Sequence, residues 1–87
     1  MEVAYRPSFL RQLRALDAAV REEIIERVAE FKDSKNHKRL RVHPLKGKLK
    51  GFYSFSVNFH HRVVFEWVGK GKNLAVLAQV GDHNIYQ

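Results

Sequence analysis

Three residues in the second half of the chain have side chains suited to phosphate chemistry. Arg62 lies in a predicted strand, and its planar, permanently charged guanidinium suits a phosphate or a pentacoordinate phosphorane. His83 and Tyr86 lie three residues apart, just past the end of a later predicted strand, where side chains can reach a concave site. Histidine exchanges a proton near neutral pH, and tyrosine can orient a hydroxyl or stack on a base. The three residues therefore predict proton transfer at a phosphodiester.

Each of these residues also has a purely structural interpretation. Arg62 can pair with Glu66 on the same face of its strand. The tail can pack Ile85 and Tyr86 onto the sheet and leave His83 exposed. From spacing alone the structural interpretation is favoured for the tail, and the functional one for Arg62.

A second group of candidates lies in the basic segment from Lys38 to Gly51. Lys46, Lys48 and Lys50 recur at every second residue, so an extended chain would place their ammonium groups on one edge roughly 6.6 Å apart. This spacing is close to the repeat of a nucleic-acid backbone and predicts a row of phosphate contacts. The alternative is a solvated loop whose lysines protect an exposed strand edge.

The distribution of charge indicates an anionic partner. The 87 residues contain 16 Lys and Arg against nine Asp and Glu, which gives a net charge of +7. Basic and acidic residues balance over residues 1–35, so residues 36–87 carry the whole excess, and no acid lies between Asp33 and Glu66. A polyanion, a phosphodiester or an acidic protein is the natural partner, although a small domain can also simply be basic.

Length and composition exclude several classes. A chain of 87 residues encloses one core, so we expect a single domain over residues 1–87. The absence of cysteine excludes disulfides, thiolate zinc sites and thiol nucleophiles. His60 and His61 would project to opposite faces of a strand, so we expect no metal site, and nothing indicates a cofactor. With no apolar run of about 20 residues and no signal peptide, we expect a soluble cytoplasmic protein without membrane contact.

The elements that must position these residues form an α+β fold. Residues 2–5 alternate as a short strand, and apolar residues at helical spacing predict an antiparallel two-helix hairpin over about residues 8–34, with Asp17 as an N-cap and Glu23 paired with Arg27. From residue 53 the period becomes two. The strands that follow predict a small antiparallel sheet of three or four strands, covered by the helices on the face of Tyr53, Phe55, Val57 and Phe59. Ser54, Ser56, Asn58 and Arg62 would line the opposite, concave face.

The sequence resembles the RelE/ParE superfamily of toxins from type II toxin–antitoxin systems. The resemblance runs from Val3 to Tyr86 and rests on three elements: the His-Pro-Leu-Lys-Gly motif at residues 43–47, the aromatic and polar strand leading into residues 61–65, and the final Val80-Gly81 followed by Tyr86. It implies two activities on one fold. RelE-type members cleave mRNA in the ribosomal A site without a metal, through attack of the 2′-hydroxyl on its own phosphate, whereas ParE-type members inhibit DNA gyrase. A noncatalytic RNA-binding module is a further alternative.

The RelE-type resemblance implies Arg62, His83 and Tyr86 as catalytic residues. Nuclease members have lysines on the strand where this chain has Ser54 and Ser56, which leaves His83 as the favoured base ahead of His43 and His61. The residues expected to contact RNA are Lys46, Lys48, Lys50, Arg41, His43, Ser54, Ser56 and His61. The resemblance also implies an acidic antitoxin as partner, with mRNA and the ribosome as targets and operator DNA reached only through the antitoxin complex.

Overall fold

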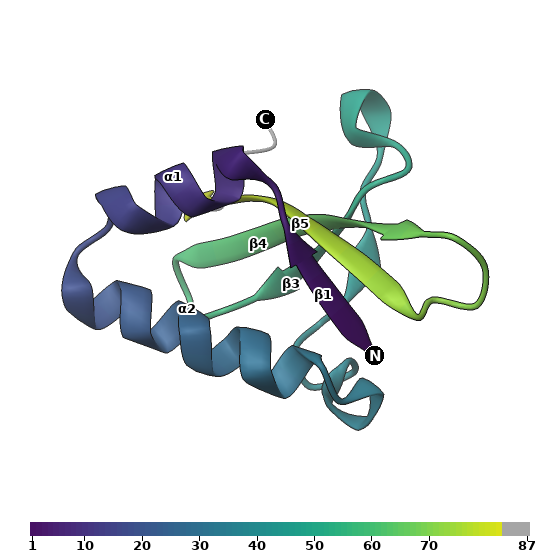
Figure 1. Ribbon diagram of the computed structural model, residues 1–87, viewed down its shortest axis with the longest axis horizontal. Coiled ribbons are helices and arrows are strands. Elements are labelled where there is room, and N and C mark those ends of the chain that lie inside the picture. The colour runs from purple at the N-terminus through teal and green to yellow at the C-terminus, as the bar shows by residue number, and fades with distance from the viewer. Residues whose placement is uncertain (83–87) are drawn as a thin grey trace.

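The computed structural model describes residues 1–82 and contains two helices and five strands. The chain runs through β1 (Glu2–Tyr5), α1 (Pro7–Ala15), α2 (Ala18–Phe31), β2 (His43–Pro44), β3 (Tyr53–Ser56), β4 (His61–Val68) and β5 (Leu74–Asp82). Two short 3₁₀ turns, Ser34–Asn36 and Gly47–Leu49, lie on either side of β2. Figure 1 shows the helix hairpin along one side of the twisted sheet. The predicted α+β class is confirmed.

The sheet has five strands and is mixed. Its strand order is β1-β5-β4-β3-β2, with β1 parallel to β5 and every other pair antiparallel. The antiparallel sheet predicted after the helix hairpin is therefore confirmed, with β2 to β5 as its four strands, and β1 adds a fifth, parallel strand at one edge. After the helix hairpin the chain enters the sheet at the far edge and meanders back, so that β5 arrives beside β1 and runs in the same direction (Figure 1). β5 lies between two strands, as its apolar sequence predicts.

One apolar core joins the helices to the sheet. Phe31 of α2 is fully buried, and its ring stacks on that of Phe55 with centroids 4.4 Å apart. Val63 and Phe65 of β4 belong to the same core. The alternation of apolar residues on β3 and β4 therefore predicts the inner face correctly.

Phe59 does not follow this alternation. β3 ends at Ser56, and residues 57–60 form a turn in which Phe59 is 87% exposed. The prediction that Phe59 continues the apolar face is wrong because the strand stops three residues before it.

Polar side chains of α1 fix this helix on β5. Ser8 Oγ donates to the carbonyl of Ala78 at 2.7 Å, and Gln12 Oε1 accepts from the amide of Val80 at 2.9 Å. These bonds hold the part of β5 that leads to its end at Asp82.

No helix within residues 1–82 is both long and apolar enough to cross a bilayer.

Two predicted details of the helix hairpin differ. Asp17 occupies the N-cap of α2, but its side chain makes no capping hydrogen bond. Arg27 pairs with Glu30 at 3.0 Å instead of Glu23. Glu23 instead accepts a hydrogen bond from Asn58 Nδ2 at 2.5 Å, across 35 residues of sequence. The local i,i+4 rule fails at Glu23 because a side chain from the sheet competes for it.

Candidate functional site

The site is a surface hollow of about 450 Å³ at the β3–β4 turn. It is lined by Arg41, Ser56, Asn58, Phe59 and Arg62, and we refer to it as the arginine hollow. Ser56 ends β3 and stands opposite Arg62 in the β3–β4 ladder. The amide of Ser56 also donates to the carbonyl of buried Leu40 at 2.8 Å. This bond ties the loop that carries Arg41 to the end of β3, so two guanidinium groups face one hollow.

The guanidinium of Arg62 is held by backbone carbonyls. Its Nη1 donates to the carbonyl of Asn58 at 2.7 Å and to that of His61 at 3.1 Å. Within residues 1–82, Nη2 and Nε donate no hydrogen bond and no carboxylate pairs with Arg62. A half-buried arginine with oriented, unused donors is suited to an anion.

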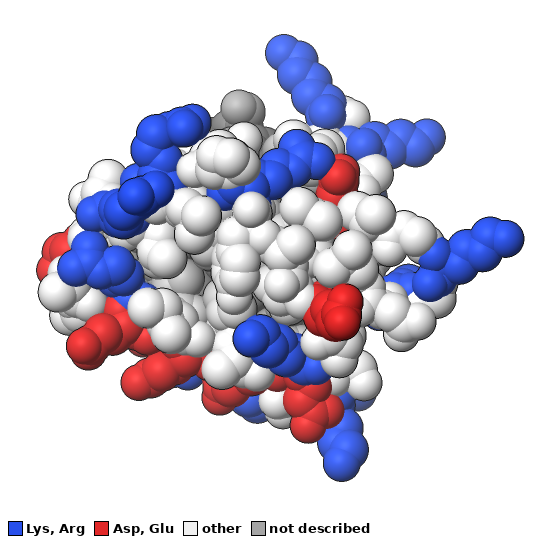
Figure 2. Space-filling model, in the orientation of Figure 1, with Lys and Arg blue, Asp and Glu red and all other residues white. Residues whose placement is uncertain are grey.

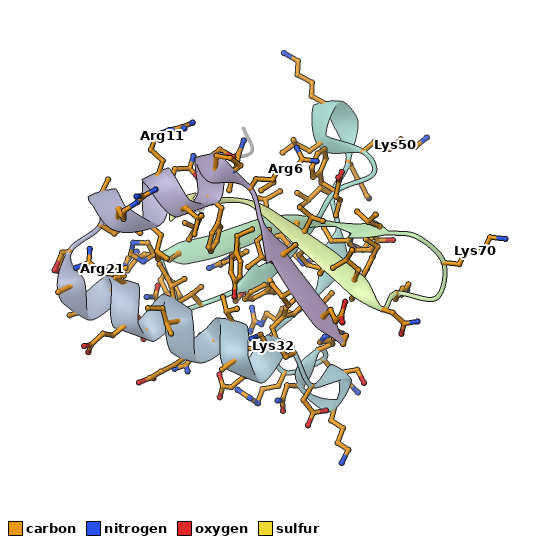
Figure 3. All side chains as sticks on the ribbon, in the orientation of Figure 1. Arg6, Arg11, Arg21, Lys32, Lys50 and Lys70 are labelled. Atoms are coloured by element: carbon orange, nitrogen blue, oxygen red, sulfur yellow. The ribbon has the colours of Figure 1, made fainter. Side chains whose placement is uncertain are left out.

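The alternative pairing of Arg62 with Glu66 is wrong. Glu66 Oε1 accepts from Arg6 Nη2 at 2.5 Å, and Arg6 comes from the junction between β1 and α1. Figure 3 shows Arg6 at that junction. An arginine 60 residues away thus neutralises Glu66 and leaves the charge of Arg62 to the hollow.

Asn58 organises the turn that bears Arg62. Its Oδ1 accepts from the amides of His60 and His61, both at 2.8 Å, and its Nδ2 donates to Glu23. Its own carbonyl accepts from Arg62. A short amide side chain that hydrogen-bonds nearby backbone is typical of a tight turn. Asn58 therefore links α2, the turn and Arg62.

Arg41 occupies an unusual backbone conformation. Its φ is +60°, in the left-handed region that residues with a Cβ rarely adopt. Its carbonyl accepts from Nδ1 of His43 at 2.7 Å, which places the His43 ring beside the loop. Non-glycine residues held in this region often lie at functional sites. Arg41 fits this pattern, because it lines the same hollow as Arg62.

The lysine row expected from spacing is not formed. Lys46, Gly47, Lys48, Leu49 and Lys50 make a 3₁₀ turn, here called the lysine turn, instead of an extended edge. Gly47 and Gly51 have φ values of +65° and +98°, which reverse the chain at both ends. The three lysines are exposed at the tip of a hairpin, and Figure 3 shows Lys50 pointing away from the protein. They form a compact basic tip and not a linear row.

The remaining predicted contact residues are divided. Ser56 lies in the arginine hollow, and His61 is half-buried with Nδ1 3.1 Å from Asn58 Oδ1. His43 is exposed on β2. Ser54 is fully buried, and no residue within 1–82 gives its Oγ a hydrogen-bond partner, so the expectation of a surface serine is wrong. β2 pairs with β3 at this residue, which makes β3 an interior strand.

His83 and Tyr86 lie outside the described residues. The ladder nevertheless shows where the described chain ends relative to the hollow. Gly81 stands opposite Arg62, and Asp82 stands opposite His61. The last described residue of β5 is therefore a ladder partner of the residue next to Arg62.

No carboxylate within residues 1–82 forms an ion pair with the basic side chains of the arginine hollow or the lysine turn. Figure 2 shows acidic side chains gathered along α2 and basic side chains projecting away from the protein at the hairpin tips. The ion pairs within residues 1–82 involve three arginines, Arg6, Arg27 and Arg39. None involves the arginine hollow or the lysine turn. Over the same residues, no three His, Asp or Glu side chains are grouped to hold a metal ion.

Sequence reasoning missed the roles of two residues, Asn58 and Phe59. It placed Asn58 on the polar face of a strand and Phe59 on the apolar face. The available signal was the turn propensity of asparagine, which competes with the strand pattern at this position.

Comparison with known proteins identifies the fold. No family model matches the chain, and no curated protein matches it. A chain of the toxin–antitoxin complex RelBE2 from Mycobacterium tuberculosis aligns with a TM-score of 0.72 at 18% identity, covering 94% of this chain and 96% of that chain. The YoeB/ParE toxin from Agrobacterium tumefaciens aligns with a TM-score of 0.66 at 23% identity, covering 95% and 99%. The archaeal RelE–RelB complex from Pyrococcus horikoshii gives 0.69 at 14% identity, covering 97% and 96%. The chain therefore has the RelE/ParE toxin fold that the sequence resemblance implies.

Proposed function

We propose that this chain, with its RelE/ParE toxin fold, is the toxin of a type II toxin–antitoxin system and a metal-independent endoribonuclease that cleaves mRNA on the ribosome. The observation that carries the proposal is the arginine hollow, where Arg62 and Arg41 present charge that no carboxylate within residues 1–82 neutralises. Two cations at one concave site suit the extra negative charge of a phosphorane. Gyrase inhibition requires no such site.

In the proposed reaction, the 2′-hydroxyl attacks its own phosphate and the 5′-oxygen of the next nucleotide leaves. A base removes the proton from the 2′-oxygen, and an acid gives a proton to the leaving 5′-oxygen, which yields a cyclic phosphate and a free 5′-hydroxyl. Arg62 stabilises the phosphorane through its unused donors. His83 transfers a proton, and Tyr86 orients a group or stacks on a base. The end of β5 opposite His61 supports this assignment, because His83 follows Asp82 directly in the sequence.

The experiment that tests this function is induction of the chain alone, with translation and DNA supercoiling followed separately. Loss of translation with cut mRNA is expected. Relaxed DNA or an SOS response without RNA cuts would instead indicate a ParE-type gyrase inhibitor. RNA association without cleavage would indicate a noncatalytic RNA-binding module.

The partner in this proposal is an acidic antitoxin. The solved complexes named above contain an antitoxin with each RelE-type toxin, and the exposed lysine turn and arginine hollow offer an acidic chain a complementary surface. We place the protein in the cytoplasm with the ribosome, and operator DNA would be reached only through the antitoxin complex. The product of the neighbouring open reading frame should bind this chain and suppress its activity. A basic or nonbinding product would contradict the assignment.

Replacement of the three lysines of the lysine turn by alanine should weaken RNA binding and leave the fold intact. The variant carries Lys46→Ala, Lys48→Ala and Lys50→Ala, whose side chains are exposed. Each lost phosphate contact should lower the slope of log affinity against log salt by about 0.7 to 0.9. A matched control replaces Lys32, Lys35 and Lys70, which removes the same charge elsewhere. Equal losses in both variants would show that net charge alone, and not the lysine turn, determines binding.

Replacement of Arg41, whose backbone is strained, by glycine should lower RNA affinity without lowering the stability of the fold. In Arg41→Gly, a residue with φ +60° becomes one that adopts this conformation freely, so the free energy of unfolding should stay constant or rise by up to about 1 kcal/mol. RNA affinity should fall because the second cation of the hollow is lost. Lys72→Gly is the control, since Lys72 has φ +55° in the β4–β5 turn and carries the same charge. It should gain the same stability without loss of affinity. Reduced stability in Arg41→Gly, measured by denaturant unfolding, would contradict the strain argument.

A further inference from the structure

Phe59 is an exposed aromatic ring at the edge of the arginine hollow. At 87% it is the most exposed of the large hydrophobic residues within 1–82, and it lines the hollow together with Arg41 and Arg62. A single exposed apolar side chain is common on proteins and needs no function. A ring beside two cations in one concavity is different, because a nucleotide presents a charged phosphate and a planar base to the same site.

The turn that presents the ring is fixed by the structure around it. The side chain of Asn58 accepts from two backbone amides of the turn and donates to Glu23, which anchors the turn to α2. The ring of His60 meets that of Phe59 nearly perpendicularly, at 78° with centroids 5.4 Å apart. The flat face of a ring held on a preorganised turn costs little further ordering when it binds a partner.

The volume of the hollow also fits this ligand class. About 450 Å³ lies within the range of small-molecule sites, roughly 300 to 1,000 Å³. Its lining contains two arginines and the polar side chains of Ser56 and Asn58, with Phe59 as the one apolar member.

We infer that Phe59 is a stacking platform for one base of a single-stranded RNA, with the phosphate of the same nucleotide on Arg41 and the adjacent, scissile phosphate on Arg62. This inference rests on the proposed function, and it names the subsite that holds the nucleotide flanking the cleaved bond. Stacking on a phenyl ring tolerates any base, so Phe59 contributes affinity and position but not base identity.

The test is binding of a 2′-O-methyl hexanucleotide to the full chain, followed by fluorescence anisotropy. This probe cannot be cleaved through its 2′-oxygen, so the measurement is independent of catalysis. Phe59→Ala should weaken binding by roughly 5- to 150-fold, the range for loss of one stacked base. Phe59→Trp should bind at least as well as wild type, whereas Phe59→Leu, which keeps apolar bulk without a π face, should resemble the alanine variant. Tyr5→Ala, at a 43% exposed aromatic residue outside the hollow, is the matched control and should bind normally.

An abasic scan of the hexanucleotide identifies the stacked base. Removal of the stacked base should lower the affinity of the wild-type protein by as much as Phe59→Ala does. The same removal should not lower the affinity of the Phe59→Ala variant any further, because the stacking contact is already lost. Normal binding by Phe59→Ala, or by Phe59→Leu, overturns the stacking inference, as does a wild-type protein that does not bind the probe. If Phe59→Ala loses affinity only for the antitoxin, the ring belongs to a protein interface and the inference fails. The translation assay above tests the nuclease function separately, so either proposal can fail alone.

Discussion

Arg62→Ala should lower the single-turnover rate of mRNA cleavage at saturating ribosomes by about 10²- to 10³-fold. The developing phosphorane carries an extra negative charge, and loss of a comparable oxyanion donor costs roughly 2.7 to 4 kcal/mol. The structure strengthens this expectation. Nη1 is held by the carbonyls of Asn58 and His61, and Arg62 lines the hollow, so the guanidinium is already positioned there before an anion binds.

Arg62→Lys separates charge from geometry in this prediction. Lysine keeps the positive charge but cannot hold two carbonyls and a phosphate in one plane, so we expect partial recovery only. Arg39→Ala is the matched control, because Arg39 is exposed and paired with Glu30 at 3.2 Å. Thermal unfolding should accompany the kinetics, since Arg62→Ala leaves the carbonyl of Asn58 without its donor. Cleavage by folded Arg62→Ala at the wild-type rate would remove Arg62 from the mechanism.

The sequence predicts the scaffold well because periodicity is a local property. The helix hairpin and the inner face of β3 and β4 follow from apolar residues at spacings of 3.6 and 2, and burial of Phe55, Val63 and Phe65 confirms them. The same reasoning fails where a nonlocal contact decides. β3 is an interior strand because it pairs at Ser54 with β2, a strand of two residues that no periodic pattern can indicate.

The candidate site is predicted in composition but not in arrangement. Arg41, Ser56 and Arg62 were expected to bind the ligand, and the structure places all three in one hollow. Their convergence depends on a hydrogen bond from Ser56 to Leu40, which joins segments 16 residues apart. The availability of Arg62 depends equally on a distant residue, because Arg6 occupies Glu66. Contacts of this kind are set by the packed fold and leave no periodic signal in the sequence.

The lysine turn shows the opposite error, in which a real pattern was given the wrong geometry. Alternation of Lys46, Lys48 and Lys50 indicates an edge only if the backbone is extended. Gly47 and Gly51 adopt positive φ and turn the chain instead, which glycine does without steric cost. The two glycines within the same segment were therefore the sequence signal against an extended backbone.

His83→Ala should reduce the single-turnover rate by roughly 10²- to 10⁴-fold while affinity for the ribosome stays nearly unchanged. Proton transfer acts in the transition state, so its loss lowers the rate and not the binding. The wild-type rate should rise through the pH range in which a histidine titrates if the imidazole is the base, or fall through it if the imidazole is the acid. In the variant this step in the pH profile should disappear. His60→Ala, at an exposed histidine of the β3–β4 turn whose ring lies against Phe59, is the control for titration alone and should retain the wild-type pH profile.

Variants of two further histidines and of Tyr86 test whether His83 is the only residue that transfers a proton. His43 and His61 are the other candidate bases, and each already contacts an oxygen through Nδ1, the carbonyl of Arg41 for His43 and Oδ1 of Asn58 for His61. In each ring this contact leaves Nε2 as the nitrogen that accepts a proton. If His83 alone is the base, alanine at either residue should preserve the pH profile that His83→Ala abolishes. Tyr86→Phe keeps the ring, so a small effect assigns Tyr86 to stacking and a large one to its hydroxyl. If His83→Ala cleaves at the wild-type rate with an unchanged profile, the imidazole transfers no proton and the base must be a different residue.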